Sequence, residues 1–95
     1  MNGFYDEDVA DENGKETRSL EVLFVNQPEL FARMAALIGR RNIALQTLEM
    51  KALKGENGDG EEYARLTLRA VLTEKEYRQL KERLRKMIGV IQVKP

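Results

Sequence analysis

The 95-residue sequence predicts an α+β domain in which two helices cover one face of a four-stranded antiparallel sheet. Three observations predict it. Apolar and polar residues alternate in segments of strand length, two other segments repeat apolar residues three and four positions apart, and the segments follow one another as β-α-β-β-α-β. Two right-handed crossovers place both helices on the same face and give the spatial strand order 4-1-3-2, the ferredoxin-like arrangement.

The first strand and helix are expected between residues 18 and 42. Leu20, Val22 and Phe24 form the core face of the strand. Pro28 suits the first position of a helix, and Glu29 complements the positive end of the helix dipole. The apolar stripe of this helix comprises Leu30, Phe31, Met34, Leu37 and Ile38. The helix is expected to end near residues 40–42, because Asn42 tolerates the left-handed conformation.

The second and third strands are expected to form a hairpin. The second strand runs from Ile43 to Leu53, and the loop of residues 55–60 contains three Gly together with Asn and Asp. Core-facing residues in the two strands are Leu48, Met50, Ala52, Ala64, Leu66, Leu68 and Ala70. A loop centred on Asn57 places Glu49 opposite Arg65 and Thr47 opposite Thr67.

The second helix begins with a capping box, in which Thr73 is the N-cap and Glu76 follows three residues later. Its apolar stripe runs from Tyr77 to Ile88, and Gly89 is expected to end it. Residues 90–93 form the last strand.

Composition excludes many functions. The sequence contains no Cys and no His, which removes disulfides, thiolate nucleophiles, imidazole metal ligands and the commonest general base at neutral pH. We therefore expect no catalytic site, no metal and no cofactor. The sequence also lacks an apolar run of the ~20 residues that span a bilayer, and a signal peptide. We expect a soluble, cytoplasmic protein with no membrane partner.

Charge divides the chain into two parts, although the net charge of the whole chain is zero. Residues 1–17 hold six acidic residues and one Lys, for a net charge of −5, and the remainder carries +5. The first part contains too few apolar residues to order itself, so we expect residues 1–17 to be an acidic tail and residues 18–95 to be the domain. On the sheet face away from the helices, Leu23, Val25 and Val71 are too apolar to face water, which indicates a covering partner.

The segment from Leu23 to Arg41 resembles the first strand and helix of an ACT domain. More narrowly, it is similar to the small regulatory subunits of acetolactate synthase (acetohydroxyacid synthase). The positions at or beside that family's pattern are Asn26, Pro28, Leu30, Arg33, Leu37, Arg40 or Arg41, Thr47 and Leu48. The segment from Leu84 to Val93 is similar to the family's last helix and strand, so the resemblance extends over residues 19–93.

The resemblance implies an amino-acid effector site at Asn26, Gln27, Glu29, Leu30 and Ala44. Two of these positions depart from the family. Glu29 replaces a Gly that lets the effector carboxylate approach, and Ala44 replaces an Asn that helps to hold the effector. The departures resemble the branch of small subunits associated with valine-insensitive isozymes. We therefore expect a weak or vestigial site that binds valine poorly or not at all.

The function that the resemblance implies is that of a non-catalytic regulatory small subunit of acetolactate synthase. Such a subunit activates the large, thiamine-diphosphate-dependent catalytic subunit in branched-chain amino-acid biosynthesis. The resemblance also implies a homodimer that pairs along the second strand, through Leu45, Thr47, Glu49 and Lys51.

Other functions remain open. The main alternative is a free-standing ACT domain that senses another amino acid and regulates a different enzyme. A more remote alternative is an RNA-binding module of the same fold, but Tyr63, Arg65, Thr67 and Arg69 do not form the aromatic platform that such modules use. An acylphosphatase-like enzyme would need an arginine cradle, which residues 26–29 do not provide. We expect no nucleic-acid partner.

Overall fold

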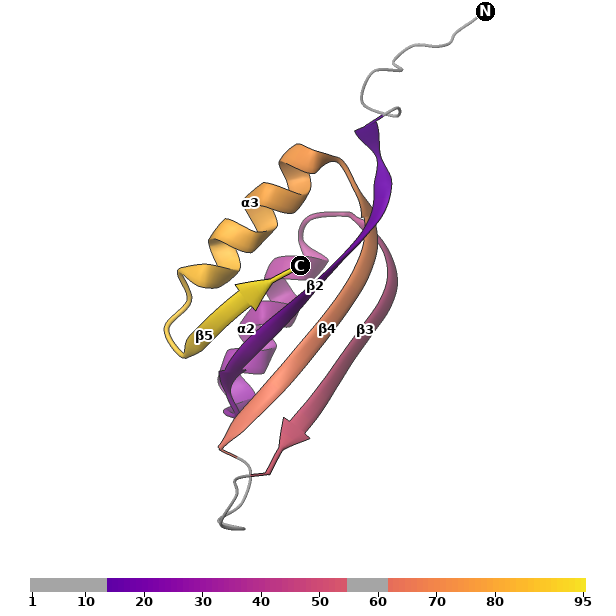
Figure 1. Cartoon of the computed structure of the whole chain (residues 1–95). Coiled ribbons are helices and arrows are strands. Elements are labelled where there is room, and N and C mark those ends of the chain that lie inside the picture. Colours follow the sequence, from indigo (N-terminus) through magenta and orange to yellow (C-terminus); the bar gives the residue numbers. More distant parts are fainter. Residues whose placement is uncertain (1–13, 55–61) are drawn as a thin grey trace, which may run out of the picture.

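The computed structural model describes residues 14–54 and 62–95 and contains four strands and two helices in the described part. The elements are β2 (Glu16–Val25), α2 (Pro28–Gly39), β3 (Ala44–Leu53), β4 (Tyr63–Leu72), α3 (Glu74–Arg85) and β5 (Val90–Lys94). The strands form one antiparallel sheet in the order β3-β4-β2-β5, and both helices lie on the same face of it (Figure 1). The predicted fold class and strand order are confirmed.

Two sequence-based expectations fall partly or wholly outside the described residues. Residues 1–13 of the expected acidic tail and the loop of residues 55–60 are not among them. β2 begins at Glu16, two residues before the expected start at Arg18.

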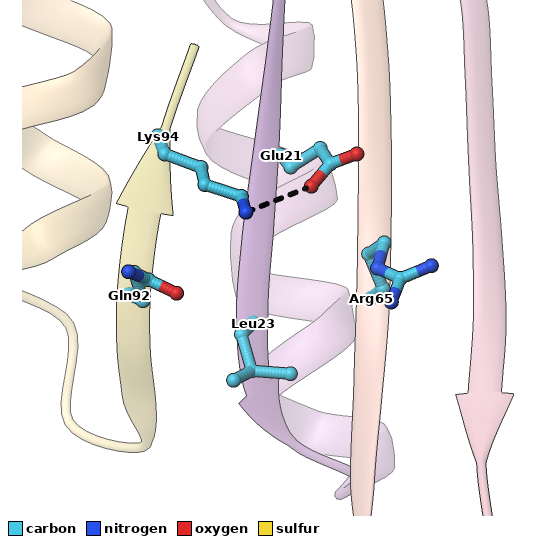
Figure 2. Close-up of a pocket in the computed structure, with 5 residues that line it drawn as sticks. All are labelled: Glu21, Leu23, Arg65, Gln92 and Lys94. Atoms are coloured by element: carbon cyan, nitrogen blue, oxygen red, sulfur yellow. Dashed lines mark ion pairs between the residues drawn. The ribbon is translucent and has the colours of Figure 1, made fainter.

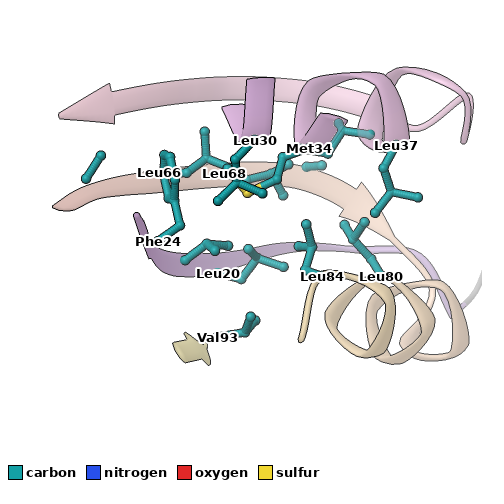
Figure 3. Packing of buried hydrophobic residues seen from close by; sticks show 14 of the residues in the cluster. Leu20, Phe24, Leu30, Met34, Leu37, Leu66, Leu68, Leu80, Leu84 and Val93 are labelled. Atoms are coloured by element: carbon teal, nitrogen blue, oxygen red, sulfur yellow. The ribbon is translucent and has the colours of Figure 1, made fainter. Parts of the chain in front are cut away.

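The core lies between the helices and the two central strands, β2 and β4. Alternate residues of these strands point to the helices and are fully buried, whereas the residues between them are not. The buried set comprises Leu20, Val22, Phe24, Leu30, Met34, Leu37, Ile38, Ala64, Leu66, Leu68, Ala70, Leu72, Leu80, Leu84 and Val93. Figure 3 shows the side chains of both helices converging on those of the strands. Burial of each large side chain contributes about 1.5–3 kcal/mol.

The predicted capping box at the start of α3 is confirmed. The Thr73 Oγ1 accepts a hydrogen bond from the Glu76 N–H at 3.1 Å, and the Thr73 N–H donates to Glu76 Oε1 at 2.9 Å. One turn later, the Tyr77 hydroxyl donates to the Ser19 carbonyl at 2.6 Å, which ties α3 to β2. The cap and this hydrogen bond fix where α3 begins relative to the sheet.

Both helices end earlier than predicted. α2 ends at Gly39, although Asn42 adopts the expected left-handed conformation, with φ 52°. α3 ends at Arg85, four residues before Gly89, so Ile88 leaves the apolar stripe and is 90% exposed. α3 ends early because the chain turns into β5, and in this turn the Val90 N–H donates a hydrogen bond to the Met87 carbonyl at 3.1 Å.

The predicted register of β3 with β4 is wrong by two residues. Glu49 lies opposite Thr67 rather than Arg65, and Thr47 lies opposite Arg69 rather than Thr67. A shift of two residues leaves every side chain on its predicted face, because side chains alternate with a period of two. Apolar alternation therefore predicted the face but could not distinguish these two registers.

The prediction that β3 contributes a buried face is also wrong. Leu48 is half-buried and Ala52 is exposed, while Met50 keeps 41% of its surface. β3 is an edge strand with β4 as its one neighbour in the sheet, and of its apolar side chains Leu48 packs against the core. The register shifts between Leu45 and Thr47, so Leu45 pairs with the buried Ala70, shares the helix-facing side with Met50, and is 44% exposed.

Replacement of Gly89 by Ala should destabilise the fold by about 1–3 kcal/mol. Gly89 has φ +100°, and a Cβ there would lie 2.6 Å from Leu30 Cδ2. Gly39 is the matched control, because a Cβ at that position meets nothing within 4 Å. Gly39→Ala should be neutral or stabilise by up to about 1 kcal/mol. Urea denaturation of both variants measures the difference, and equal stability of the two would contradict the close approach at Gly89.

Stability should also depend on the charge of Glu76. The hydrogen bond from the Thr73 N–H lowers the pKa of Glu76 from its ordinary value of 4.5; burial opposes this shift, and the Lys15 ammonium 3.7 Å away adds to it. Because the pKa is lower in the folded state, the stabilisation is present above the ordinary value and is lost as the pH falls through the folded pKa.

We therefore expect Glu76→Gln to be less stable than the unchanged chain at about pH 7, with the difference shrinking towards about pH 3. Gln can still accept the Thr73 hydrogen bond, so the comparison isolates the charge. Urea denaturation across this pH range measures it. A difference that stays constant with pH would refute the assignment.

Candidate functional site

The expected effector site lies at the junction between β2 and α2, which hydrogen bonds hold from both sides. The Val25 N–H donates to the Gly89 carbonyl at 2.8 Å, and the Asn26 N–H donates to the Glu62 carbonyl at 3.0 Å. The junction is thus tied to the turn before β5 and to the start of β4. These hydrogen bonds hold its backbone in place, and they form because β5 and β4 are the two neighbours of β2 in the sheet.

Most of the backbone donors at the start of α2 are already used. Gln27 is the N-cap residue, and its side chain makes no capping hydrogen bond. Its carbonyl instead accepts from Leu30 N–H at 3.0 Å and from Phe31 N–H at 3.2 Å, while Pro28 has no N–H. Among the described residues, no acceptor bonds to the N–H of Glu29. The helix start therefore offers a ligand one free backbone donor.

Glu29 places a carboxylate beside that donor. Its side chain is exposed in the first turn of α2, whereas that of Leu30 turns into the core and is 2% exposed. Two like charges ~4 Å apart repel by ~1 kcal/mol in water and by more where water is excluded. The residue that stabilises the helix dipole therefore opposes a second carboxylate at the same helix start.

Ala44 lies at the other end of the sheet. It pairs with Val71, whereas Val25, next to the junction, pairs with Tyr63 at the opposite end of β4. Eight residues of strand separate the two levels, or ~26 Å. The structure therefore brings Asn26, Gln27, Glu29 and Leu30 together and does not bring Ala44 to them within one chain.

The residues expected at the dimer edge all lie on β3, the edge strand next to β4. Thr47, Glu49 and Lys51 are exposed on the face away from the helices, and Leu45 is exposed on the helix-facing side. The edge position was predictable from element order. The change of face at Leu45 was not, because nothing in the local alternation marks the register shift.

We call the sheet face away from the helices the open face. Figure 2 looks onto it and shows Lys94 and Glu21 joined by an ion pair of 3.9 Å above Leu23 and Arg65. These residues and Gln92 line a hollow of about 90 Å³. That is far below the roughly 300–1,000 Å³ of a typical small-molecule pocket. The centre of the open face is polar and shallow.

One end of the open face is apolar, and sequence reasoning identified it only in part. Leu23, Leu53, Tyr63 and Ile91 surround a hollow of about 390 Å³, with Lys54 at its rim. We call these four residues the apolar end. Tyr63 is 43% exposed and Ile91 52%. The sequence predicted Leu23 to be on this face, but Ile91 joins it only because the pairing of β2 with β5 shifts beside Leu23.

The described residues contain no group of three or more His, Cys, Asp or Glu side chains placed to hold a metal ion. Within residues 14–54 and 62–95, no helix is both long and apolar enough to cross a membrane.

Sequence comparison does not place this chain in a family: no family model matches it, and no curated protein matches it. Solved structures do match its fold. The ACT domain from GTP pyrophosphokinase of Chlorobium tepidum superposes with a TM-score of 0.70 at 16% identity, over 84% of this chain and 96% of that domain.

Two other solved structures are similar. The C-terminal domain of the MgtC protein from Mycobacterium tuberculosis has a TM-score of 0.66 at 20% identity and covers 95% of this chain and 88% of that one. The acetolactate synthase small subunit from Thermotoga maritima has a TM-score of 0.65 at 21% identity, over 84% of this chain. This chain spans 47% of that subunit. At these identities the likeness establishes a shared fold.

Proposed function

We propose that this chain is a non-catalytic regulatory domain of the ACT type, and that it is the small subunit of an acetolactate synthase. The observation that carries the proposal is the agreement between its fold and that of solved ACT domains. The similarity in fold to the Thermotoga maritima small subunit supports the finer assignment. The segment from Leu23 to Arg41, which resembles that family in sequence, spans the end of β2, the β2–α2 junction and α2.

A regulatory role also fits the side chains present. With neither Cys nor His in the sequence, a thiolate nucleophile and an imidazole general base are missing. A domain of this kind acts on an enzyme by binding to it. The proposed partner is the large thiamine-diphosphate-dependent catalytic subunit, and the expected effect is an increase in its activity.

The alternative is a free-standing ACT domain that regulates a different enzyme. The match to the ACT domain of a GTP pyrophosphokinase, a protein of another activity, favours it equally. Fold alone does not separate the two, because one fold serves many partners.

Affinity purification of this chain from its native host tests the choice between them. Recovery of a large thiamine-diphosphate-dependent enzyme whose activity rises on adding the purified chain supports the acetolactate synthase assignment. Recovery of a different enzyme favours the alternative. A matched bait carrying Leu45→Glu and Met50→Glu shows whether recovery depends on the exposed apolar residues of β3.

We also propose that two copies pair along β3. An edge strand presents unpaired backbone groups, and this one has Leu45 and Met50 exposed beside half-buried Leu48 on its helix-facing side. Antiparallel pairing of two β3 strands would extend the sheet from four strands to eight and cover these side chains. It would also set the Ala44 end of one copy beside the Leu53 end of the other, which lies next to the β2–α2 junction. The effector position that one chain leaves distant would then be supplied by the second.

The dimer predicts a specific effect of charge on β3. Leu45→Glu together with Met50→Glu should convert a dimer into a monomer at tens of micromolar, measured by light scattering, because like charges would face one another across the interface. Both side chains are more than 40% exposed in the single chain, so the domain should still fold. Ile88→Glu, at an exposed apolar residue away from β3, should leave the dimer intact. A monomeric unchanged chain would rule out this interface.

The helix start predicts weak binding of valine. In the proposed dimer, which sets Ala44 of one copy near the junction of the other, repulsion by Glu29 and the missing side-chain acceptor at Ala44 should together weaken binding by about two orders of magnitude relative to a site with Gly and Asn. Calorimetry should detect no micromolar binding of valine, leucine or isoleucine by the unchanged chain. Glu29→Gly with Ala44→Asn should gain it.

Glu74→Gly is the control for this measurement, because Glu74 also lies in the first turn of a helix but away from the junction. It should gain no binding. Saturable micromolar binding of valine by the unchanged chain would overturn the expectation for this site.

A further inference from the structure

The open face combines a row of basic residues with the apolar end. Arg69 lies opposite Ser19, and Arg65 lies opposite both Leu23 and Lys51, so these cations follow one another along the sheet towards the apolar end. None of the three has an ion-pair partner among the described residues. The face also carries Glu21 and Glu49; Glu21 is already paired with Lys94 at 3.9 Å, and cations outnumber carboxylates.

The first residues of the chain have the complementary composition in the complementary order. Residues 1–13 contain no basic residue. Counted back from Gly14, the acids come first and the aromatic residues last: Glu12, Asp11, Asp8, Glu7, Asp6, Tyr5 and Phe4. A segment that doubles back at Gly14 would therefore meet the open face with acids over the arginines and aromatic rings over the apolar end.

We propose that residues 4–12 dock on the open face of their own chain, with Phe4 and Tyr5 on the apolar end and the acids along Arg69, Arg65 and Lys51. The length is sufficient. Phe4 is ten residues from Gly14, a reach of ~33–36 Å, and Leu23 lies nine residues further along the chain from Gly14, or ~30 Å. An extended segment that reverses at Gly14 therefore just reaches the apolar end.

The surface of α3 is the nearest competing site. It lies close to the start of β2, since Lys15 approaches Glu76 to 3.7 Å, and it carries several basic residues. Glu74, Glu76 and Glu82 are interspersed among them, however, and the large exposed apolar residues of the described part lie elsewhere. α3 could attract the acids, but its one aromatic ring, that of Tyr77, is already in contact with Arg18 and Lys81.

A second copy stacked on the open face fits less well. The apolar end occupies only one end of the face, and the rest of the face is lined mainly by polar and charged side chains around shallow hollows of about 90 and 490 Å³. If two open faces stacked about a twofold axis through their centres, the polar side chains of one copy would contact those of the other, and the two apolar ends would not meet. An extended segment fits better, because it can follow the strands from the basic residues to the apolar end.

The absence of Cys from the sequence allows a direct test with a single spin label. The full chain with Asn2→Cys carries the label next to Phe4, and paramagnetic broadening of methyl signals reports which surface the label approaches. Methyl signals of Leu23, Leu53 and Ile91 should lose intensity several-fold more than those of Leu45 and Leu80. Broadening concentrated on α3, or broadening without preference for any surface, would overturn the proposal.

Two pairs of substitutions test the contacts. Phe4→Ser with Tyr5→Ser, and separately Arg65→Ser with Arg69→Ser, should each reduce the broadening at Leu23 and Ile91 several-fold. Arg78→Ser with Arg83→Ser on α3 is the matched control and should leave it unchanged. If the control pair and the arginine pair reduced the broadening at Leu23 and Ile91 equally, the effect would depend only on net charge, and docking on this face would be refuted.

A mixture of isotope-labelled unmodified chain and spin-labelled unlabelled chain identifies the occupant. The unmodified chain should show no broadening at Leu23 or Ile91. Broadening there would assign the segment to a second copy and overturn docking within one chain. The measurement involves neither an amino acid nor a catalytic subunit, so its outcome is independent of the proposed regulatory role.

Discussion

The pairing of β2 with β4 is the constraint on which the rest of the structure depends. Both helices contribute side chains to the core on one face of these strands, where alternate residues are buried from Leu20 to Phe24 of β2 and from Ala64 to Leu72 of β4. The same alternation places the residues between them on the open face, whatever their chemistry. The core therefore determines which side chains remain available for binding: Leu23 and Arg65 are exposed to partners because Val22 and Leu66 are not.

At the two strand–helix junctions, an acidic residue in the first turn of the helix has different consequences. Each helix starts with an acidic residue in its first turn, where the dipole favours negative charge. At α3 the carboxylate of Glu76 closes a capping box and stabilises the fold. At α2 the N-cap side chain makes no such bond, and Glu29 instead lies beside a free backbone donor. A carboxylate that stabilises the fold at one helix start would, in the proposed effector site, oppose a ligand carboxylate at the other.

If this chain regulates an enzyme as proposed, it does so through its surfaces, and three of them have exposed apolar or unpaired polar groups. The β3 edge has unpaired backbone and exposed Leu45 and Met50, which a second copy would satisfy. Along the open face, a row of basic residues leads to the apolar end. The acidic and aromatic residues at the start of the chain follow one another in the matching order. At the β2–α2 junction, Glu29 lies beside the free backbone donor of the helix start. Docking of the acidic segment would leave the β3 edge and the junction free for a partner.

Periodicity and end signals in the sequence determined the element types, their order, the strand order and the capping box, because each depends on residues close together in the chain. The register of β3, the turn that ends α3 at Arg85, and the exposure of Met50 were decided only by tertiary structure. Each of these depends on how far a helix covers the sheet or how long a loop is, which alternation does not encode. The candidate site also has a part that the sequence determined and a part that tertiary structure decided. Residues 26–30 are adjacent in the sequence and adjacent in space, whereas Ala44 lies at the far end of the sheet because α2 carries the chain there before β3 begins.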